Sequence, residues 1–357
     1  MFTLRCGCLR GVERLGAGLA ALIWIVAQMG FLTIRDVTVT PGTRCLIGGK
    51  RRHVRLVCRA LQKSIHSSKL NKMASAYHSN LNKSLIVRSA RLHVRETAYP
   101  STQARSMKDK VAIITGAAGD IGLAIARKFL QAGARVALLD VDEDALRVRS
   151  LNVIGQIEHS KLLCMACDVA DENATKNCVD AVARTLGGLH LLVNNAAPFT
   201  TTHAIADLPT ADWEKALAVN ATGAFLMSKW SIPHMRTCGG GVILNIASQI
   251  GHVTAFGRGA YGASKAALLS LTRSIAIDHA DDNIRCVSIS PGAVMTGRLI
   301  RRYGTEQAAA EALAPRYPAK RIGLPDEIAA AALFLAGDGA AFVTGTDLLV
   351  DGGYTAI

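Results

Sequence analysis

Seven short, continuously apolar runs are the feature of this sequence that most restricts its fold. They recur only after residue 107, and longer stretches rich in Ala, Leu, Lys and Glu separate them. A strand buried on both faces is apolar throughout, whereas a strand with one face in water alternates. Such strands alternating with helices predict a single α/β domain with a doubly wound parallel sheet. The runs are 111–115, 135–140, 162–169, 189–195, 241–248, 284–291 and 347–352.

A glycine-rich turn follows the first run and leads into a helical stretch. Glycines let the backbone approach a pyrophosphate, and the N-terminus of the next helix offers N–H groups and the positive end of its dipole. Asp140 ends the second run, where a carboxylate accepts hydrogen bonds from ribose hydroxyls and repels a 2′-phosphate. The order of strand, turn, helix and acid therefore predicts a Rossmann-type site that prefers NAD to NADP. The turn residues in question are Thr115, Gly116, Gly119, Asp120, Ile121 and Gly122.

A second group of residues has the composition of an acid–base site. Tyr261 and Lys265 are four residues apart in YGASK, which places them on one face of a helix. A tyrosine is a poor base at neutral pH, and an ammonium group beside a phenol favours its phenolate form. Ser248 ends the fifth run, at the carboxyl edge of the sheet, where its hydroxyl can hold a substrate oxygen.

Residues 107–357 resemble the short-chain dehydrogenase/reductase family along essentially their whole length. The elements that carry the resemblance follow the family's order. They are the turn at 115–122, Cys167-Asp168-Val169, Asn194-Asn195-Ala196-Ala197, Asn220 in VNATGAF, Ser248, YGASK at 261–265, Pro291-Gly292 with Thr296, and FVTGTDLLVDGGYTA at 342–356.

The resemblance implies a role for each matching residue. Tyr261 is the general acid/base, Lys265 tunes it and holds the nicotinamide ribose, and Ser248 orients the substrate oxygen. Asn220 supports a water chain that leads protons to Lys265. Hydride passes between the substrate carbon and the nicotinamide, so no metal is expected. Besides the turn, Asp140, Tyr261 and Lys265, the expected cofactor contacts are Asp168, Val169, Asn195, Ala196, Pro291, Gly292, Val294 and Thr296.

The implied activity is NAD-dependent oxidation of a secondary alcohol or reduction of a ketone. Two alternatives stay open. One is a 3-oxoacyl-carrier-protein reductase, which usually uses NADPH and is disfavoured by Asp140. The other is a non-catalytic dinucleotide-binding member, which the intact catalytic positions disfavour and the unusual Asp120 supports. Asp120 stands where the family has a glycine, and we expect it either to cap the helix or to compete with the pyrophosphate for its N–H groups.

The resemblance also implies a homo-oligomer, a tetramer or a dimer. Pairing is expected through the helices that follow Asn220 and Tyr261, where the Ala-rich stretch 260–272 permits close packing. We expect the other partner to be a small-molecule alcohol or ketone. Cys164 and Cys167 are three apart on an expected strand and so face opposite ways, which argues against a shared metal.

The first 106 residues differ from the rest in charge. They hold 18 Lys and Arg against 3 acids, whereas residues 107–357 hold 23 against 24. The net charge of +14 therefore belongs to the leader, and it does not indicate a nucleic-acid-binding domain.

Three interpretations of residues 1–106 stay open, namely an unstructured or wrongly annotated leader, an organelle-targeting leader, and a membrane anchor. Residues 15–34 are uncharged and long enough to span a bilayer, so membrane contact depends on them. Residues 61–106 are rich in Ser and Arg and poor in acids, as transit peptides are. The folded domain, 107–357, is expected to be cytoplasmic unless the leader directs it elsewhere. We expect the leader to be mostly irregular and dispensable for folding.

Overall fold

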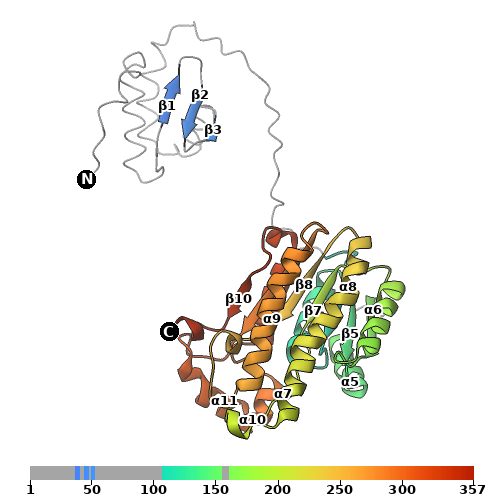
Figure 1. Cartoon of the computed structure of the whole chain (residues 1–357), viewed down its shortest axis with the longest axis vertical. Helices are drawn as coiled ribbons and strands as arrows, with labels where there is room; N and C mark the ends of the chain where they lie inside the picture. Colours follow the sequence, from blue (N-terminus) through green and yellow to red (C-terminus); the bar gives the residue numbers. More distant parts are fainter. Residues whose placement is uncertain (1–36, 41–43, 48–49, 53–106, 155–160) are drawn as a thin grey trace, which may run out of the picture. The chain divides into compact units, whose positions relative to one another are not determined.

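The computed structural model describes residues 37–40, 44–47, 50–52, 107–154 and 161–357 (Figure 1). The chain divides into two compact units, Met1–Glu96 and Thr97–Ile357. The apolar segment 15–34 and the Ser-rich stretch 61–106 lie outside the described residues. No helix of the described part has both the length and the apolar character needed to cross a membrane.

The described part of the first unit is a three-stranded antiparallel sheet. Its strands are β1 (Val37–Thr40), β2 (Arg44–Ile47) and β3 (Lys50–Arg52), with β2 in the centre. Val37 pairs with Ile47 between β1 and β2, and Cys45 pairs with Arg52 between β2 and β3. The leader was expected to be mostly irregular, and its described residues form these three strands. They are too short for a period of two to stand out in the sequence.

The second unit contains one seven-stranded sheet, in which every neighbouring pair is parallel. The strand order is β10-β9-β8-β7-β4-β5-β6, so the chain reverses direction across the sheet between β4 and β7. This confirms the doubly wound sheet expected from the apolar runs. The strands are β4 (Val111–Thr115), β5 (Arg135–Asp140), β6 (Leu162–Ala166), β7 (Leu191–Asn194), β8 (Gly241–Ile246), β9 (Ile284–Pro291) and β10 (Asp347–Val350).

Four of the expected strands extend too far at their carboxyl ends. Residues 167–169, 195, 247–248 and 351–352 follow β6, β7, β8 and β10 rather than belong to them. These residues form the loops at the carboxyl edge, where an open parallel sheet places its ligands. The strands predicted from the apolar runs are therefore too long at the edge of the sheet that carries the candidate site.

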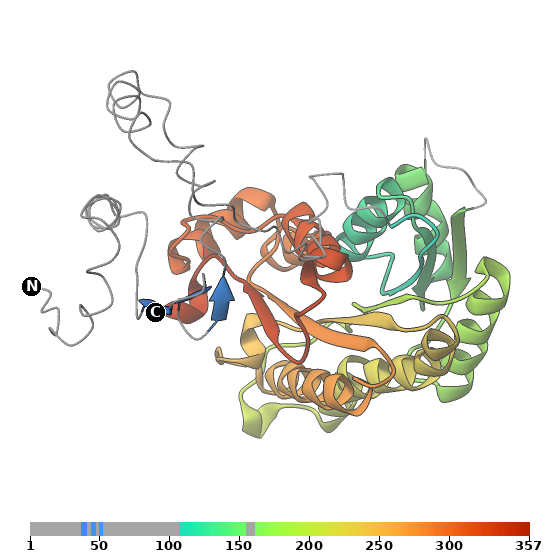
Figure 2. The same ribbon diagram turned by 90° about the horizontal axis from the view of Figure 1, so that it is seen from above.

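Helices cover both faces of the sheet (Figure 2). Core residues of α4, α5 and α12 pack on one face, and core residues of α6, α8 and α9 pack on the other. The helices of the domain are α4 (Asp120–Gln131), α5 (Glu143–Ile154), α6 (Glu172–Leu186), α7 (Thr210–Leu217), α8 (Ala224–Thr237), α9 (Gly259–Asp278), α10 (Gly297–Tyr303), α11 (Glu306–Leu313) and α12 (Pro325–Ala336).

The strand β4 shows why its sequence is apolar throughout. All five of its residues are buried. Ala112 and Ile114 belong to the core under α4 and α12, whereas Val111 and Ile113 belong to the core under α6 and α8. Successive side chains of a strand point to opposite faces, so a central strand between two helix layers has no polar face.

Candidate active site

The turn after β4 brings two backbone segments into close contact. Gly116 has φ +61°, and a Cβ on it would stand 2.6 Å from Cα of Ala196. A Cβ on Gly122 would stand 2.8 Å from the carbonyl oxygen of Gly116. Only glycine fits at these two positions, because the first needs a left-handed backbone and the second leaves no room for a side chain.

Hydrogen bonds join this turn to the end of β7. The Thr115 hydroxyl accepts the N–H groups of Asn195 and Ala196 at 3.0 and 3.1 Å. The Asn195 side-chain amide donates to the carbonyls of Thr115 and Gly116, each at 3.0 Å. Four of the residues that we expected to contact the cofactor therefore form the hydrogen bonds that hold the turn in its shape. They are Thr115, Gly116, Asn195 and Ala196. They lie where the strand order reverses, which is where α/β sheets bind dinucleotides.

Asp140 lies beside the same turn, as the sequence spacing predicted. Its Oδ2 accepts the Ala118 N–H at 2.9 Å, and its Oδ1 accepts the Asp142 N–H at 3.2 Å. Each carboxylate oxygen still has a lone pair available. The side chain is only partly buried, so a ribose can reach it.

Asp120 does not cap helix α4, contrary to one of the two expectations. The N-cap residue is Gly119, and no side chain accepts a hydrogen bond there. Instead Asp120 Oδ2 accepts the Gly297 N–H at 2.7 Å, and Oδ1 forms a short ion pair with Arg149. Arg149 also donates to the Ala118 carbonyl at 2.6 Å. The extra carboxylate is therefore turned away from the helix N–H groups and paired with a cation.

The stretch after β9 approaches the site from the other side. Gly292 lies so close to β10 that a Cβ on it would stand 2.9 Å from Cα of Asp351. Val294 is buried and bridges to Gly323. Thr296 caps α10, because its hydroxyl accepts the Leu299 N–H at 3.3 Å. Gly297 then bonds to Asp120, so the start of α10 is fixed to the turn.

The residues expected near the adenine lie at the end of β6. Asp168 is exposed, and its carboxylate accepts the Ala170 N–H at 2.9 Å. Val169 is buried against Gly223, where a Cβ would stand 2.7 Å from the valine Cγ2. Nearby, Cys164 is exposed and Cys167 is buried. Cys167 follows β6 rather than belonging to it, so the geometric argument from a shared strand does not apply to this pair.

Tyr261 and Lys265 lie in the first turns of α9, on one face of the helix. Lys265 is 2% exposed, and its Nζ donates to the Ile246 carbonyl at 2.7 Å. The same Nζ is 5.8 Å from the Tyr261 ring centroid. Burial, with the positive charge of Arg298 as the second cause, lowers the pKa of Lys265 from 10.5 to about 7.

Asn220 lies in a π-helical turn, Ala218–Gly223, that interrupts the run from α7 into α8. Such turns are uncommon and often occur at functional sites. Its Nδ2 donates to the Ser264 hydroxyl at 2.9 Å, and that hydroxyl donates to the Tyr261 carbonyl at 2.8 Å. Its Oδ1 is buried and has no partner among the described residues. Asn220 thus contacts the helix turn that carries Tyr261 and has a free acceptor.

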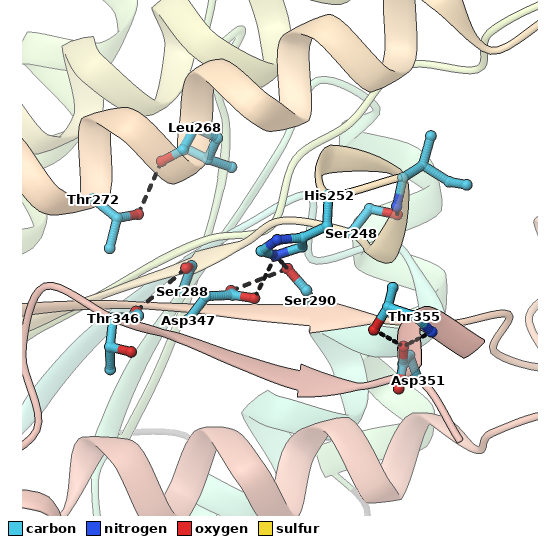
Figure 3. A network of polar contacts seen from close by, with 11 residues as sticks. Ser248, His252, Leu268, Thr272, Ser288, Ser290, Thr346, Asp347, Asp351 and Thr355 are labelled. Atoms are coloured by element: carbon cyan, nitrogen blue, oxygen red, sulfur yellow. Dashed lines mark hydrogen bonds and ion pairs between the residues drawn. The ribbon is translucent and has the colours of Figure 1, made fainter. Parts of the chain in front are cut away.

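Ser248 directly follows β8 and starts a short turn that is tied to β10 (Figure 3). Its hydroxyl accepts the Ile250 N–H at 3.2 Å. At the end of this turn His252 Nε2 contacts Asp347 Oδ2 at 2.8 Å, and the Ser290 hydroxyl donates to Asp347 Oδ1 at 3.0 Å. The loop that carries Ser248 is therefore anchored to two neighbouring strands.

Comparisons with known proteins identify the family to which this chain belongs. A family model described as enoyl-(acyl carrier protein) reductase matches residues 116–355. A short-chain type dehydrogenase/reductase from Mycobacterium marinum has a similar structure, with a TM-score of 0.66 and 31% identity, covering 71% of this chain and 98% of its own. The chain belongs to the short-chain dehydrogenase/reductase family.

Two relatives of this family indicate the type of reaction. The 2-(R)-hydroxypropyl-CoM dehydrogenase of Xanthobacter autotrophicus is 40% identical over 70% of this chain and 99% of its own. The NAD-dependent glycerol dehydrogenase of Listeria innocua is 37% identical over 70% of this chain and 95% of its own. The chain is therefore an oxidoreductase of the short-chain dehydrogenase/reductase type that acts on CH–OH groups and binds a nicotinamide dinucleotide.

Two arginines near the site were not singled out from the sequence. Arg149 lies 29 residues beyond Asp120, and no local pattern connects them. Arg258 precedes α9, and its Cζ lies 4.7 Å from the Tyr261 ring centroid. The spacing of three residues between Arg258 and Tyr261 was a usable signal, because the N-cap residue of a helix lies near the residue three positions further along.

Proposed function

We propose that this protein is an NAD-dependent dehydrogenase of secondary alcohols, or a reductase of the corresponding ketones, with Tyr261 as the general acid/base. The observation that carries the proposal is the grouping of Tyr261, Lys265, Ser248 and Asn220 at the carboxyl edge of the sheet, beside a turn shaped for a dinucleotide. A non-catalytic dinucleotide-binding member would need Lys265 for the ribose but would not need the tyrosine, the serine and the asparagine together with it.

The residues around the turn fit a nicotinamide dinucleotide. Gly116 and Gly122 let the turn pack tightly just before α4, and the first N–H groups of α4 have no side-chain cap, so they are available to a pyrophosphate. Asp140 would hold the adenosine ribose and exclude a 2′-phosphate, which supports NAD over NADP. Pairing with Arg149 neutralises Asp120, so this carboxylate does not prevent the pyrophosphate from binding.

The chain's own residues supply the proton chemistry. In the oxidation, the Tyr261 phenolate accepts the proton of the substrate hydroxyl, and the Ser248 hydroxyl holds the same oxygen in place. The bound nicotinamide would accept the hydride that leaves the carbinol carbon. In its protonated form, Lys265 near Tyr261 favours the phenolate. Asn220 offers its free Oδ1 as an acceptor for water and so supports the path by which the proton leaves.

A panel of secondary alcohols and ketones with NAD and NADP tests this proposal. The expected result is turnover of at least one alcohol with NAD, and a lower kcat/KM with NADP. The Ser248→Ala variant removes only the hydroxyl that orients the substrate. It should lower kcat/KM for the alcohol and leave the affinity for NAD unchanged. Binding of NAD without turnover of any substrate would support the non-catalytic alternative instead, and turnover confined to NADPH and 3-oxoacyl carriers would support the reductase alternative.

The buried Lys265 predicts a pH-dependent cost to stability. The unfolded chain protonates this lysine below about pH 10.5, whereas the folded chain protonates it only below about pH 7. Between these pH values the unfolded state binds more protons, so lowering the pH favours unfolding. The Lys265→Met variant lacks this group. Its free energy of unfolding should therefore rise relative to wild type as the pH falls from about 10 to about 7, and level off below.

Urea denaturation at a series of pH values measures this difference. The Lys215→Met variant, at an exposed lysine of α7, controls for the loss of a lysine charge. A difference between Lys265→Met and wild type that stays constant over the whole range would show that Lys265 is not desolvated in the folded protein.

We also propose that residues 107–357 fold and function without the leader. Met107 is 3% exposed and bonds through its N–H to the Ala132 carbonyl at 2.8 Å, which supports a domain boundary just before it. A protein that begins at Met107 should keep the melting temperature and the NAD affinity of the full chain.

Light scattering on this shortened protein should show a dimer or tetramer, because large apolar side chains are exposed on the outer helices, as at Phe225 (47%) and Ile277 (77%). Insolubility, a loss of several degrees or a monomer mass would contradict the proposal.

A further inference from the structure

Three arginines from two segments lie close to one another beside the candidate site, and one of them contacts Tyr261. Arg258 stacks on the tyrosine ring just before α9 begins. Arg298 and Arg302 lie one turn apart on α10. The Cζ of Arg302 is 5.4 Å from the Phe199 ring centroid. Burial lowers the pKa of Arg258, and the charges of Arg302 and Arg298 lower it further, so the three guanidinium groups are near enough to repel one another.

The segment 197–205 forms the common support for this group. Arg298 donates to the carbonyls of Ala197 and Pro198 at 2.7 and 3.2 Å, and Arg302 donates to the carbonyl of Thr200 at 3.0 Å. On the other side, Gly257 and Gly259 pack so closely against this segment that a Cβ on either would collide with it. The loop before α9 and helix α10 are therefore held against the same wall.

The charge of this group is not balanced by the protein. Within the described residues none of the three arginines forms an ion pair, whereas Arg127, Arg149 and Arg321 each pair with a carboxylate. The Nη1 of Arg258 is buried and has no hydrogen-bond acceptor there. A buried charged donor without an acceptor is destabilising, so such a position favours a ligand that supplies one.

We propose that Arg258, with Arg302 and Arg298 at the rim, forms an anion subsite of the substrate pocket, and that the substrate alcohol carries a carboxylate or sulfonate. Because Arg258 stacks on Tyr261, the charged group lies only a few bonds from the carbon that reacts. Guanidinium groups match planar oxyanions with two parallel hydrogen bonds. This inference names the substrate class of the proposed dehydrogenase and rests on that function.

The cofactor's pyrophosphate is the other anion that arginines at this site can bind. Its expected position is at the N-terminus of α4, beside Asp120, whereas Arg258 stacks on Tyr261 at the reacting end. Arg298 directly follows Gly297, which bonds to Asp120, so it is the member closest to the turn. Arg258 is therefore the residue whose replacement separates the two sources of negative charge.

The test compares each of several hydroxy acids with its own methyl ester. The probes are 3-hydroxybutyrate, 4-hydroxypentanoate and 2-hydroxypropanesulfonate, which differ in length and in acid type. In the wild type, kcat/KM for at least one acid should exceed that for its ester by about 10²-fold. The Arg258→Met variant should lower this acid-to-ester ratio at least about tenfold, and Arg302→Met should lower it less. The Arg258→Lys variant should retain more of the ratio, because it keeps the charge.

Arg301→Met is the matched control, since Arg301 is an exposed arginine of the same helix and should leave the ratio unchanged. A binding measurement gives a readout without turnover. Butyrate should bind to the NADH-loaded wild type at least about tenfold more tightly than to NADH-loaded Arg258→Met, and butyramide should bind both alike.

Each outcome decides between the sources. Esters turned over as well as acids, or butyrate binding equally to both proteins, would overturn the anion subsite and leave the dehydrogenase proposal intact. An NADH affinity that falls in Arg258→Met as much as the butyrate affinity would assign the arginines to the cofactor phosphates and overturn the inference. Selective butyrate binding without turnover of any alcohol would support the subsite and contradict the proposed function.

Discussion

Replacing Tyr261 with phenylalanine is expected to lower kcat by about 10²–10⁴-fold, the range typical of a general acid–base group. The ring remains, so its stacking with Arg258 and its packing at the start of α9 are preserved. Only the hydroxyl that exchanges the proton is lost. The affinity for NAD and the melting temperature should therefore stay close to those of the wild type, because neither depends on the hydroxyl.

Kinetics and binding on the same preparation distinguish loss of chemistry from loss of structure. Tyr303→Phe offers a matched control, because it removes a tyrosine hydroxyl from α10, outside the catalytic group. The Tyr303→Phe variant should retain its activity. Tyr261→Phe with a rate near that of the wild type would exclude Tyr261 as the acid/base, and an equal loss in both variants would show that the effect is not specific to the site.

The second large effect is expected at Asp140. The wild type should prefer NAD to NADP, because a carboxylate beside the 2′-position repels a phosphate by about 2–4 kcal/mol at the effective dielectric of a partly buried site, which corresponds to about 30-fold to 10³-fold. Asp140→Arg should reverse the preference, because a guanidinium group attracts the phosphate. Asp140→Ala should weaken the preference without reversing it.

The Asp140 carboxylate also accepts the Ala118 N–H, so its removal changes the turn as well as the charge. Asp140→Asn separates these effects, because the amide oxygen can still accept that hydrogen bond while the charge is gone. We expect Asn to give a preference between those of Asp and Arg, at nearly wild-type stability. Equal kcat/KM with both cofactors in the wild type would refute the role of Asp140.

Much of the fold followed from the sequence because local pattern determines it. A strand between two helix layers must be apolar on both faces, and β4 and β5 show this directly. The spacing of Tyr261 and Lys265 likewise placed both on one side of a single helix. The carboxyl ends of the strands were predicted less well, because several residues that follow them, such as Cys167, Val169 and Ala247, are apolar and buried like the strands themselves.

The parts that the sequence did not reveal depend on contacts between distant segments. Asp120 was expected to act on its own helix, but its partners are Arg149 on α5 and Gly297 on α10. The arginine cluster is similar, since Arg258 and Arg302 come together only because segment 197–205 supports both. Single-sequence patterns report neighbours along the chain, and these pairs are neighbours only in the folded domain.

The most direct test of the central claim follows the hydrogen itself. The protein is incubated with NAD and a secondary alcohol deuterated at the carbinol carbon, and the reduced cofactor is analysed by mass spectrometry. Each NADH formed should carry one deuterium, and the rate at which this labelled product forms should fall about 10²–10⁴-fold with Tyr261→Phe but not with Tyr303→Phe. Unlabelled NADH, or labelling that is unaffected by Tyr261→Phe, would contradict the claim that this chain oxidises an alcohol by direct hydride transfer with Tyr261 as its base.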